Sequence, residues 1–158
     1  MKLLNKIMAL KLKLPSFSEL PDETQKYFEI CKKKIGYVPN VLRAYSHDIE
    51  QLNTFSSFYN GLMLAKTGLS PLEREMIAVV VSSKNHCYYC LTAHGQAVRE
   101  YSGDAVLGEA LAMNYKSANL NERHRSMLDF AVKLTLDPAN MDENDRELLR
   151  SSGFTEKE

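Results

Sequence analysis

The chain has 158 residues, of which 44% are apolar and 25% charged, as in an ordinary globular protein. Lys plus Arg and Asp plus Glu both number 20, so the overall charge gives no reason to expect binding to nucleic acid or to an anionic membrane. A domain of this size buries roughly 70% of its unfolded surface and needs no disulfide framework for stability. These properties predict a single domain over residues 1–158.

Three features predict a cytoplasmic protein. Residues 1–6 begin like a signal peptide, but Lys11 and Lys13 interrupt the apolar stretch and no small-residue cleavage site follows. The longest apolar run, residues 76–81, is far shorter than the roughly 20 residues of a membrane helix. The chain has three cysteines, and an oxidised secreted domain would seldom have an odd number.

Helical signals dominate the first half of the chain. Residues 23–34 carry apolar side chains at helical spacing, and Gly36 closes this segment. A short helix is predicted over 39–45. A longer helix is predicted over 48–68, opened by Asp48 as its cap.

The sequence Ser-Pro-Leu-Glu at 70–73 predicts a helix start, because it is a capping box with proline at the first helical position. Residues 76–81 are apolar and partly β-branched, so a strand is the alternative. The capping box and the charged residues 73–75 favour the helix, which would end before the polar segment 83–86. The helix is apolar around most of its circumference and should lie in the core.

The second half of the chain is predicted to be helical as well. A helix begins at the cysteines and runs to about residue 101, and others follow over 104–113, 121–137 and 142–153. Residues 155–158 resemble the first turn of a further helix. With short connections and no repeat, the chain is predicted to be one all-α domain.

Cys87-Tyr88-Tyr89-Cys90 is the most informative motif. Two thiols at i and i+3 lie on one face of a helix and can close into a disulfide. They stand where a helix begins, and unpaired backbone N–H groups stabilise a thiolate there. His94 can share the same face and accept a thiol proton. The motif therefore predicts redox chemistry.

The sequence leaves open two alternatives for the cysteine pair, a zinc site and a pair of structural cysteines. Zinc could use Cys87, Cys90, His94 and also His86, but Cys31 is the only further thiol. Structural cysteines would be buried as small apolar residues. We expect Cys31 to be a core residue.

The position of Glu75 is not fixed by spacing. It stands about 12 Å before the end of its helix, and a short return segment could bring Cys87 alongside it. The alternative is a surface acid in a first turn, where anions suit the helix dipole. The remaining histidines, His47, His86 and His124, are predicted to lie on the surface.

The segment from Glu75 to His94 follows the pattern Glu, eleven residues, Cys-x-x-Cys, three residues, His. It resembles the active-site signature of the AhpD-like alkylhydroperoxidases in the carboxymuconolactone decarboxylase superfamily. The wider similarity is to the peroxidase-related branch and covers nearly the whole chain from about Pro15. It includes the segments 36–45, 58–60, 68–81, 90–95 and 127–135.

This resemblance implies an all-α fold and an obligate homo-oligomer, typically a trimer or hexamer. It implies a dithiol peroxidase with Cys90 as the peroxidatic thiol, Cys87 as the resolving thiol, and Glu75 with His94 as the proton relay. The redox group would be the Cys87–Cys90 disulfide, without a metal or a separate cofactor. The partners would be a hydroperoxide and an external dithiol, either a lipoyl or a thioredoxin-like protein.

Two departures from the family pattern bear on function. Tyr89 stands where better-studied AhpD proteins have a second histidine, so one proton acceptor is missing. Relatives in the peroxidase-related branch continue beyond the equivalent of Glu158, so the chain is either truncated or lacks a packing element. The alternatives to a peroxidase are a redox-sensing module with negligible turnover and a decarboxylase, although decarboxylation has no evident need for two thiols.

Overall fold

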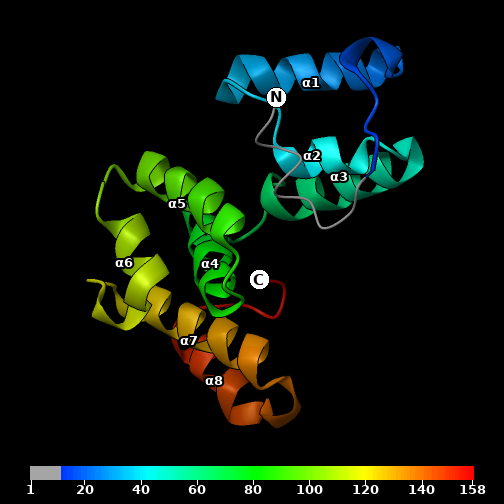
Figure 1. The fold of residues 1–158 in the computed structure, drawn as a ribbon. Coiled ribbons are helices and arrows are strands. Elements are labelled where there is room, and N and C mark those ends of the chain that lie inside the picture. The colour runs from blue at the N-terminus through cyan, green and yellow to red at the C-terminus, as the bar shows by residue number, and fades with distance from the viewer. Residues whose placement is uncertain (1–11) are drawn as a thin grey trace. The chain divides into compact units, whose positions relative to one another are not determined.

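The structure is a computed structural model that describes residues 12–158 (Figure 1). All regular elements in this range are helices, as the sequence predicts. None of the helices described is long and apolar enough to cross a membrane. Residues 1–6, considered above as a signal peptide, lie outside the described range.

The chain folds into two compact units that divide after Leu62. Within the described part of the first unit, the α-helices are α1 (Asp22–Ile35), α2 (Asn40–Tyr45) and α3 (Ile49–Met63). Their core consists of four buried apolar residues, Leu20, Phe28, Leu42 and Leu52. A single domain over residues 1–158 stays a prediction.

Local hydrogen bonds explain where α1 and α3 end. Gly36 has a φ of 84° and its N–H caps the Lys32 carbonyl, as expected for the glycine that closes α1. α3 ends at Met63 and not at Gly68 as predicted. The Arg74 guanidinium donates a hydrogen bond to the Met63 carbonyl at 3.2 Å, which satisfies a backbone acceptor that the end of the helix leaves unpaired.

The second unit is built around α4 (Pro71–Lys84). α5 (Tyr88–Ser102), α6 (Leu107–Asn114) and α7 (Glu122–Leu136) all pack against α4, and α8 (Glu143–Ser151) packs against α7 (Figure 1). Three side chains of α4 have no exposed surface, namely Met76, Val79 and Val80. The prediction of a core helix at this segment is confirmed.

Local hydrogen bonds explain where α4 begins and ends. Ser70 Oγ accepts the Glu73 N–H at 3.1 Å, and the Ser70 N–H donates to Glu73 Oε2 at 2.7 Å, which forms the predicted capping box. The helix continues through Ser83, beyond its predicted end. The Ser83 hydroxyl donates to the Ala112 carbonyl of α6 at 2.6 Å, so this polar side chain is satisfied within the helix packing.

The later helices also have side-chain caps. Asn121 and Asp142, where these two helices are predicted to begin, cap α7 and α8. α6 begins at Leu107 and not at the predicted residue 104, because the Asp104 carboxylate accepts the N–H groups of the turn before the helix. Residues 155–158 form a hydrogen-bonded turn without continuing into a helix.

α5 and α6 approach closely at two glycines. Gly95 and Gly108 are both buried, and a Cβ placed on Gly108 would lie 2.8 Å from the Gly95 carbonyl oxygen. Such a distance requires the backbone of one helix to move. The contact therefore fixes α6 against the turn of α5 that follows His94.

We expect Gly108→Ala to lower the free energy of unfolding by about 1–3 kcal/mol, because it overpacks this helix contact. Denaturant unfolding followed by circular dichroism measures the change.

Gly61→Ala is the matched control, since Gly61 lies within α3 with no atom within 4 Å of its added Cβ. This control should be neutral or stabilising by up to about 1 kcal/mol. Equal stability of Gly108→Ala and the wild type would contradict the rigid contact.

Candidate active site

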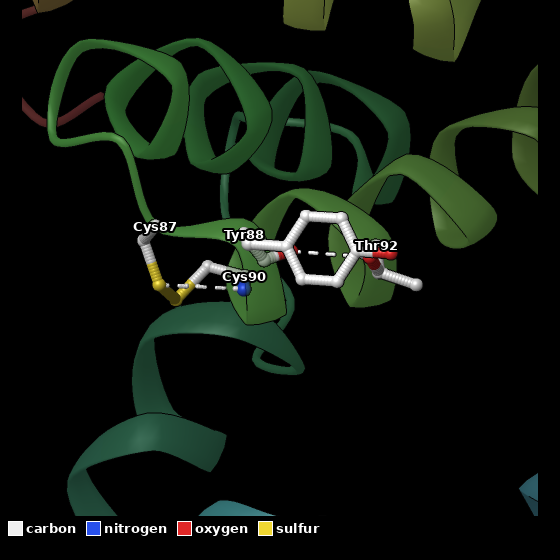
Figure 2. Close-up of a disulfide and its surroundings, with 4 residues drawn as sticks. All are labelled: Cys87, Tyr88, Cys90 and Thr92. Atoms are coloured by element: carbon white, nitrogen blue, oxygen red, sulfur yellow. Dashed lines mark hydrogen bonds between the residues drawn. A yellow bond between two sulfur atoms is a disulfide. The ribbon is translucent and has the colours of Figure 1, made fainter. Parts of the chain in front are cut away.

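The Cys-x-x-Cys motif forms the start of α5. Cys87 is the N-cap residue, and its Sγ accepts a hydrogen bond from the Cys90 N–H at 3.4 Å (Figure 2). This sulfur therefore occupies the place that a Ser or Asp oxygen takes at other helix starts. When the cysteines are reduced, the same N–H and the helix dipole stabilise a thiolate on Cys87.

Cys87 and Cys90 are joined by a disulfide, with their Cα atoms 5.4 Å apart. Both residues are half-buried, so the sulfur pair lies near the surface and not in a sealed core. The alternative of two buried structural cysteines is therefore wrong. The third cysteine, Cys31, is free and half-buried, and burial raises the pKa of its thiol.

The two tyrosines of the motif are both exposed. Tyr88 is 83% exposed, and Figure 2 shows its ring directed away from the disulfide. Tyr89 is 36% exposed. The first turn of α5 thus carries two exposed aromatic side chains.

Glu75 and His94 form a direct contact between α4 and α5. Glu75 Oε2 lies 2.6 Å from His94 Nδ1, and the side chains of His94 and Glu75 are only 20% and 11% exposed. The alternative of Glu75 as a surface acid is wrong, because the residue is buried. His94 follows Cys90 by four residues, which is just over one helical turn.

This contact fixes the chemistry that the imidazole can perform. An ionised carboxylate only accepts hydrogen bonds, so with Glu75 ionised the hydrogen sits on Nδ1 of His94. Nε2 is then left as the acceptor. A carboxylate in this arrangement orients the ring and stabilises the positive charge that follows proton uptake at Nε2.

A second buried carboxylate anchors the beginning of α4. The Arg123 Nε donates to Glu73 Oε1 at 2.8 Å, and the Arg123 guanidinium also lies 3.7 Å from the centre of the Phe154 ring. Burial raises the pKa of Glu73, but the hydrogen bonds from the Ser70 N–H and Arg123 outweigh this effect and hold it below its ordinary value. The pair was not predicted from the sequence, because 50 residues separate its members and neither lies in a motif.

The remaining histidines differ in their exposure. His47 and His86 are exposed, as predicted, and the ring of His124 is 24% exposed and 3.9 Å from a Glu73 oxygen. His86 has a left-handed backbone with a φ of 53°. Across residues 12–158, no three His, Cys, Asp or Glu side chains are grouped so that they could hold a metal ion.

An all-helical fold and a disulfide one turn before an imidazole that contacts a buried carboxylate describe a helical dithiol protein. Comparison with known proteins gives its family. The model of the carboxymuconolactone decarboxylase family matches residues 50–106. A crystal structure of an uncharacterized peroxidase-related protein from Silicibacter sp. TM1040 is 60% identical and superposes with a TM-score of 0.90. The match covers 94% of this chain and 77% of that chain.

A second crystal structure gives the same result. It is described as an alkylhydroperoxidase AhpD core, an uncharacterized peroxidase-related protein from Ralstonia eutropha JMP134. It is 36% identical with a TM-score of 0.88, and the match covers 92% of this chain and 76% of that chain. No curated protein matches the chain. The chain belongs to the AhpD-like, peroxidase-related branch of the carboxymuconolactone decarboxylase superfamily.

In the oxidised protein, we expect a maleimide in denaturant to label Cys31 alone, because Cys87 and Cys90 are joined. After reduction, all three cysteines should be labelled. Mass spectrometry of the tryptic peptides measures both patterns, and any crosslink that involves Cys31 would contradict the pairing.

Proposed function

We propose that the protein is a thiol-dependent peroxidase that reduces hydroperoxides through a Cys87–Cys90 dithiol and disulfide cycle. The observation that carries the proposal is the combination on α5 of a surface disulfide and, one turn later, an imidazole held by a buried carboxylate. Thiol oxidation requires a nucleophilic sulfur and a group that moves its proton. Membership of the peroxidase-related branch supports the same chemistry.

The catalytic cycle begins with Cys90, to which the family resemblance assigns the attack. Nε2 of His94 takes the thiol proton, and Glu75 holds the ring and stabilises its charge. The Cys90 thiolate attacks the distal peroxide oxygen, the O–O bond breaks, and the leaving alkoxide takes the proton from His94 Nε2 and departs as an alcohol. Cys90 becomes a sulfenic acid.

Cys87 then resolves this sulfenic acid. Its thiol loses a proton and the thiolate attacks the Cys90 sulfur, so that the S–S bond forms and the S–O bond breaks. The departing hydroxide takes up that proton and leaves as water. The position of Cys87 at the helix start suits this step, because the Cys90 N–H stabilises a thiolate there. An external dithiol, either a lipoyl or a thioredoxin-like protein, reduces the disulfide by thiol exchange.

The wider biological setting of this activity is a proposal too. The family resemblance supports assembly into a trimer or hexamer, which would cover apolar side chains that are exposed in the chain alone. Examples in the second unit are Val106 and Met113, which are 70% and 86% exposed. A cytoplasmic location, with a reducing thiol pool, stays a prediction.

We expect Cys90→Ser and Cys87→Ser each to abolish steady-state peroxide consumption with a small dithiol as reductant. Their oxidised products should differ, because only the attacking thiol forms a sulfenic acid. Peroxide-treated Cys87→Ser should carry a trapped sulfenic acid on Cys90, and Cys90→Ser should carry none on Cys87. Mass spectrometry after dimedone labelling measures this difference.

Cys31→Ser is the control and should retain full turnover, since Cys31 lies in the other unit. A single stoichiometric oxidation in the wild type, without turnover, would instead support a redox sensor. A sulfenic acid on Cys87 alone would reverse the roles of the two thiols.

We expect Glu75→Gln to slow the reaction with peroxide about 10- to 100-fold, because a neutral amide no longer stabilises the charged His94 ring. Stopped-flow peroxide consumption by the reduced protein measures this rate.

Glu109→Gln makes the same chemical change in an exposed ion pair with Arg99, where the carboxylate is 58% exposed. This control should react at the wild-type rate. If Glu75→Gln also reacts at the wild-type rate, the proton relay is wrong.

A further inference from the structure

His86, immediately before the first cysteine, has an unusual backbone conformation. Within residues 12–158 it is the one residue other than glycine with a positive φ, at 53°. This region raises the free energy of an L-residue by about 1–2 kcal/mol, although Asn, Asp and His tolerate it better than most residues and glycine best. Since glycine would make the turn with less strain, the imidazole requires an explanation beyond the turn.

Of the four histidine rings, that of His86 is the one without a polar partner among the described residues, so both of its nitrogens are available for proton transfer. The side chain is exposed and has no hydrogen bond or ion pair with the described part of the chain. His94 and His47 are hydrogen-bonded through Nδ1. His124 lies 3.9 Å from an oxygen of Glu73.

His86 is next to the sulfur that begins α5. The Cα atoms of His86 and Cys87 are about 3.8 Å apart across a trans peptide bond. The turn is fixed in place, because the Cys87 N–H donates to the Ser82 carbonyl at 3.0 Å. Both the imidazole and the half-buried cysteine therefore lie at the accessible start of the helix.

The other ionisable groups near this turn are poorly placed to accept a proton from Cys87. Lys84, at the end of α4, carries its ammonium 5.7 Å from the centre of the Tyr115 ring and is a cation. Glu75 is hydrogen-bonded to His94. The phenols within the motif are poor bases near neutral pH, whereas an imidazole exchanges protons there.

From these observations we infer that His86 is the general base for Cys87, so that each thiol of the pair has its own imidazole. The inference rests on the proposed function and extends it to the resolving step. His86 takes the proton from the Cys87 thiol, and the resulting thiolate attacks the sulfur of the Cys90 sulfenic acid. The S–S bond forms, the S–O bond breaks, and the departing hydroxide takes the proton from His86 and leaves as water.

The test measures the reactivity of Cys87 without peroxide. In a Cys90→Ser background, which keeps the backbone N–H at residue 90, iodoacetamide alkylation of the Cys87 peptide is followed by mass spectrometry from pH 5.5 to 9. His86→Gly keeps the left-handed turn without its ring, and His86→Asn keeps a polar side chain that does not titrate. We expect both substitutions to slow alkylation at pH 7 about 3- to 10-fold and to shift its midpoint to higher pH.

His47→Asn is the control, because it removes an exposed histidine of the other unit, and it should leave the profile unchanged. Cys31, which lies in the other unit, is an internal reference for the alkylation rate in every sample, and circular dichroism monitors folding. Unchanged profiles in both His86 variants overturn the inference. So does a slower rate in His86→Asn alone, which would indicate an effect of the backbone.

The result is independent of the peroxidase proposal. If the alkylation rate of Cys87 depends on His86 but the protein shows no peroxide turnover, the inference is supported and the proposed activity is refuted. If peroxide turnover is full but the alkylation profile of Cys87 does not depend on His86, the proposed activity is supported and the inference is refuted.

Discussion

The contact between Glu75 and His94 is the interaction on which the site depends. It joins two helices whose residues are 19 positions apart, through a 2.6 Å contact that is largely removed from solvent. Because α4 is a core helix, a carboxylate on its second turn has little freedom to move. The imidazole that it holds is therefore fixed in ring orientation and tautomer, one turn beyond the cysteine pair.

The start of α4 combines a hydrophobic core with an unusual density of buried charge. Glu73, Arg74 and Glu75 are each less than 9% exposed, and each has a specific polar partner. Burying a charge without a partner would be strongly unfavourable, so these contacts are conditions for the helix to enter the core at this point. The same contacts place Glu75, which links the stability of the second unit to the geometry of its site.

The first turn of α5 has two roles in one structure. Its unpaired N–H groups need acceptors, and a cysteine sulfur serves as one of them at Cys87. The sulfur that satisfies the helix is also the one that exchanges bonds with Cys90 in the proposed cycle. This turn is partly exposed to solvent, whereas the side chains of Glu75 and His94 are largely shielded from it.

The sequence by itself determined the helical class, the capping box of α4, the core character of residues 76–81 and the cysteine pair, because these depend on neighbours within a few positions. It left open whether Glu75 meets His94, and it gave no indication of the Glu73–Arg123 pair or of the left-handed backbone at His86. It also placed the end of α3 too late, since Arg74 captures the Met63 carbonyl from the next helix. Only the tertiary structure decided these points, because each depends on groups that are distant in the chain or on the path of a turn, and spacing permits such contacts without requiring them.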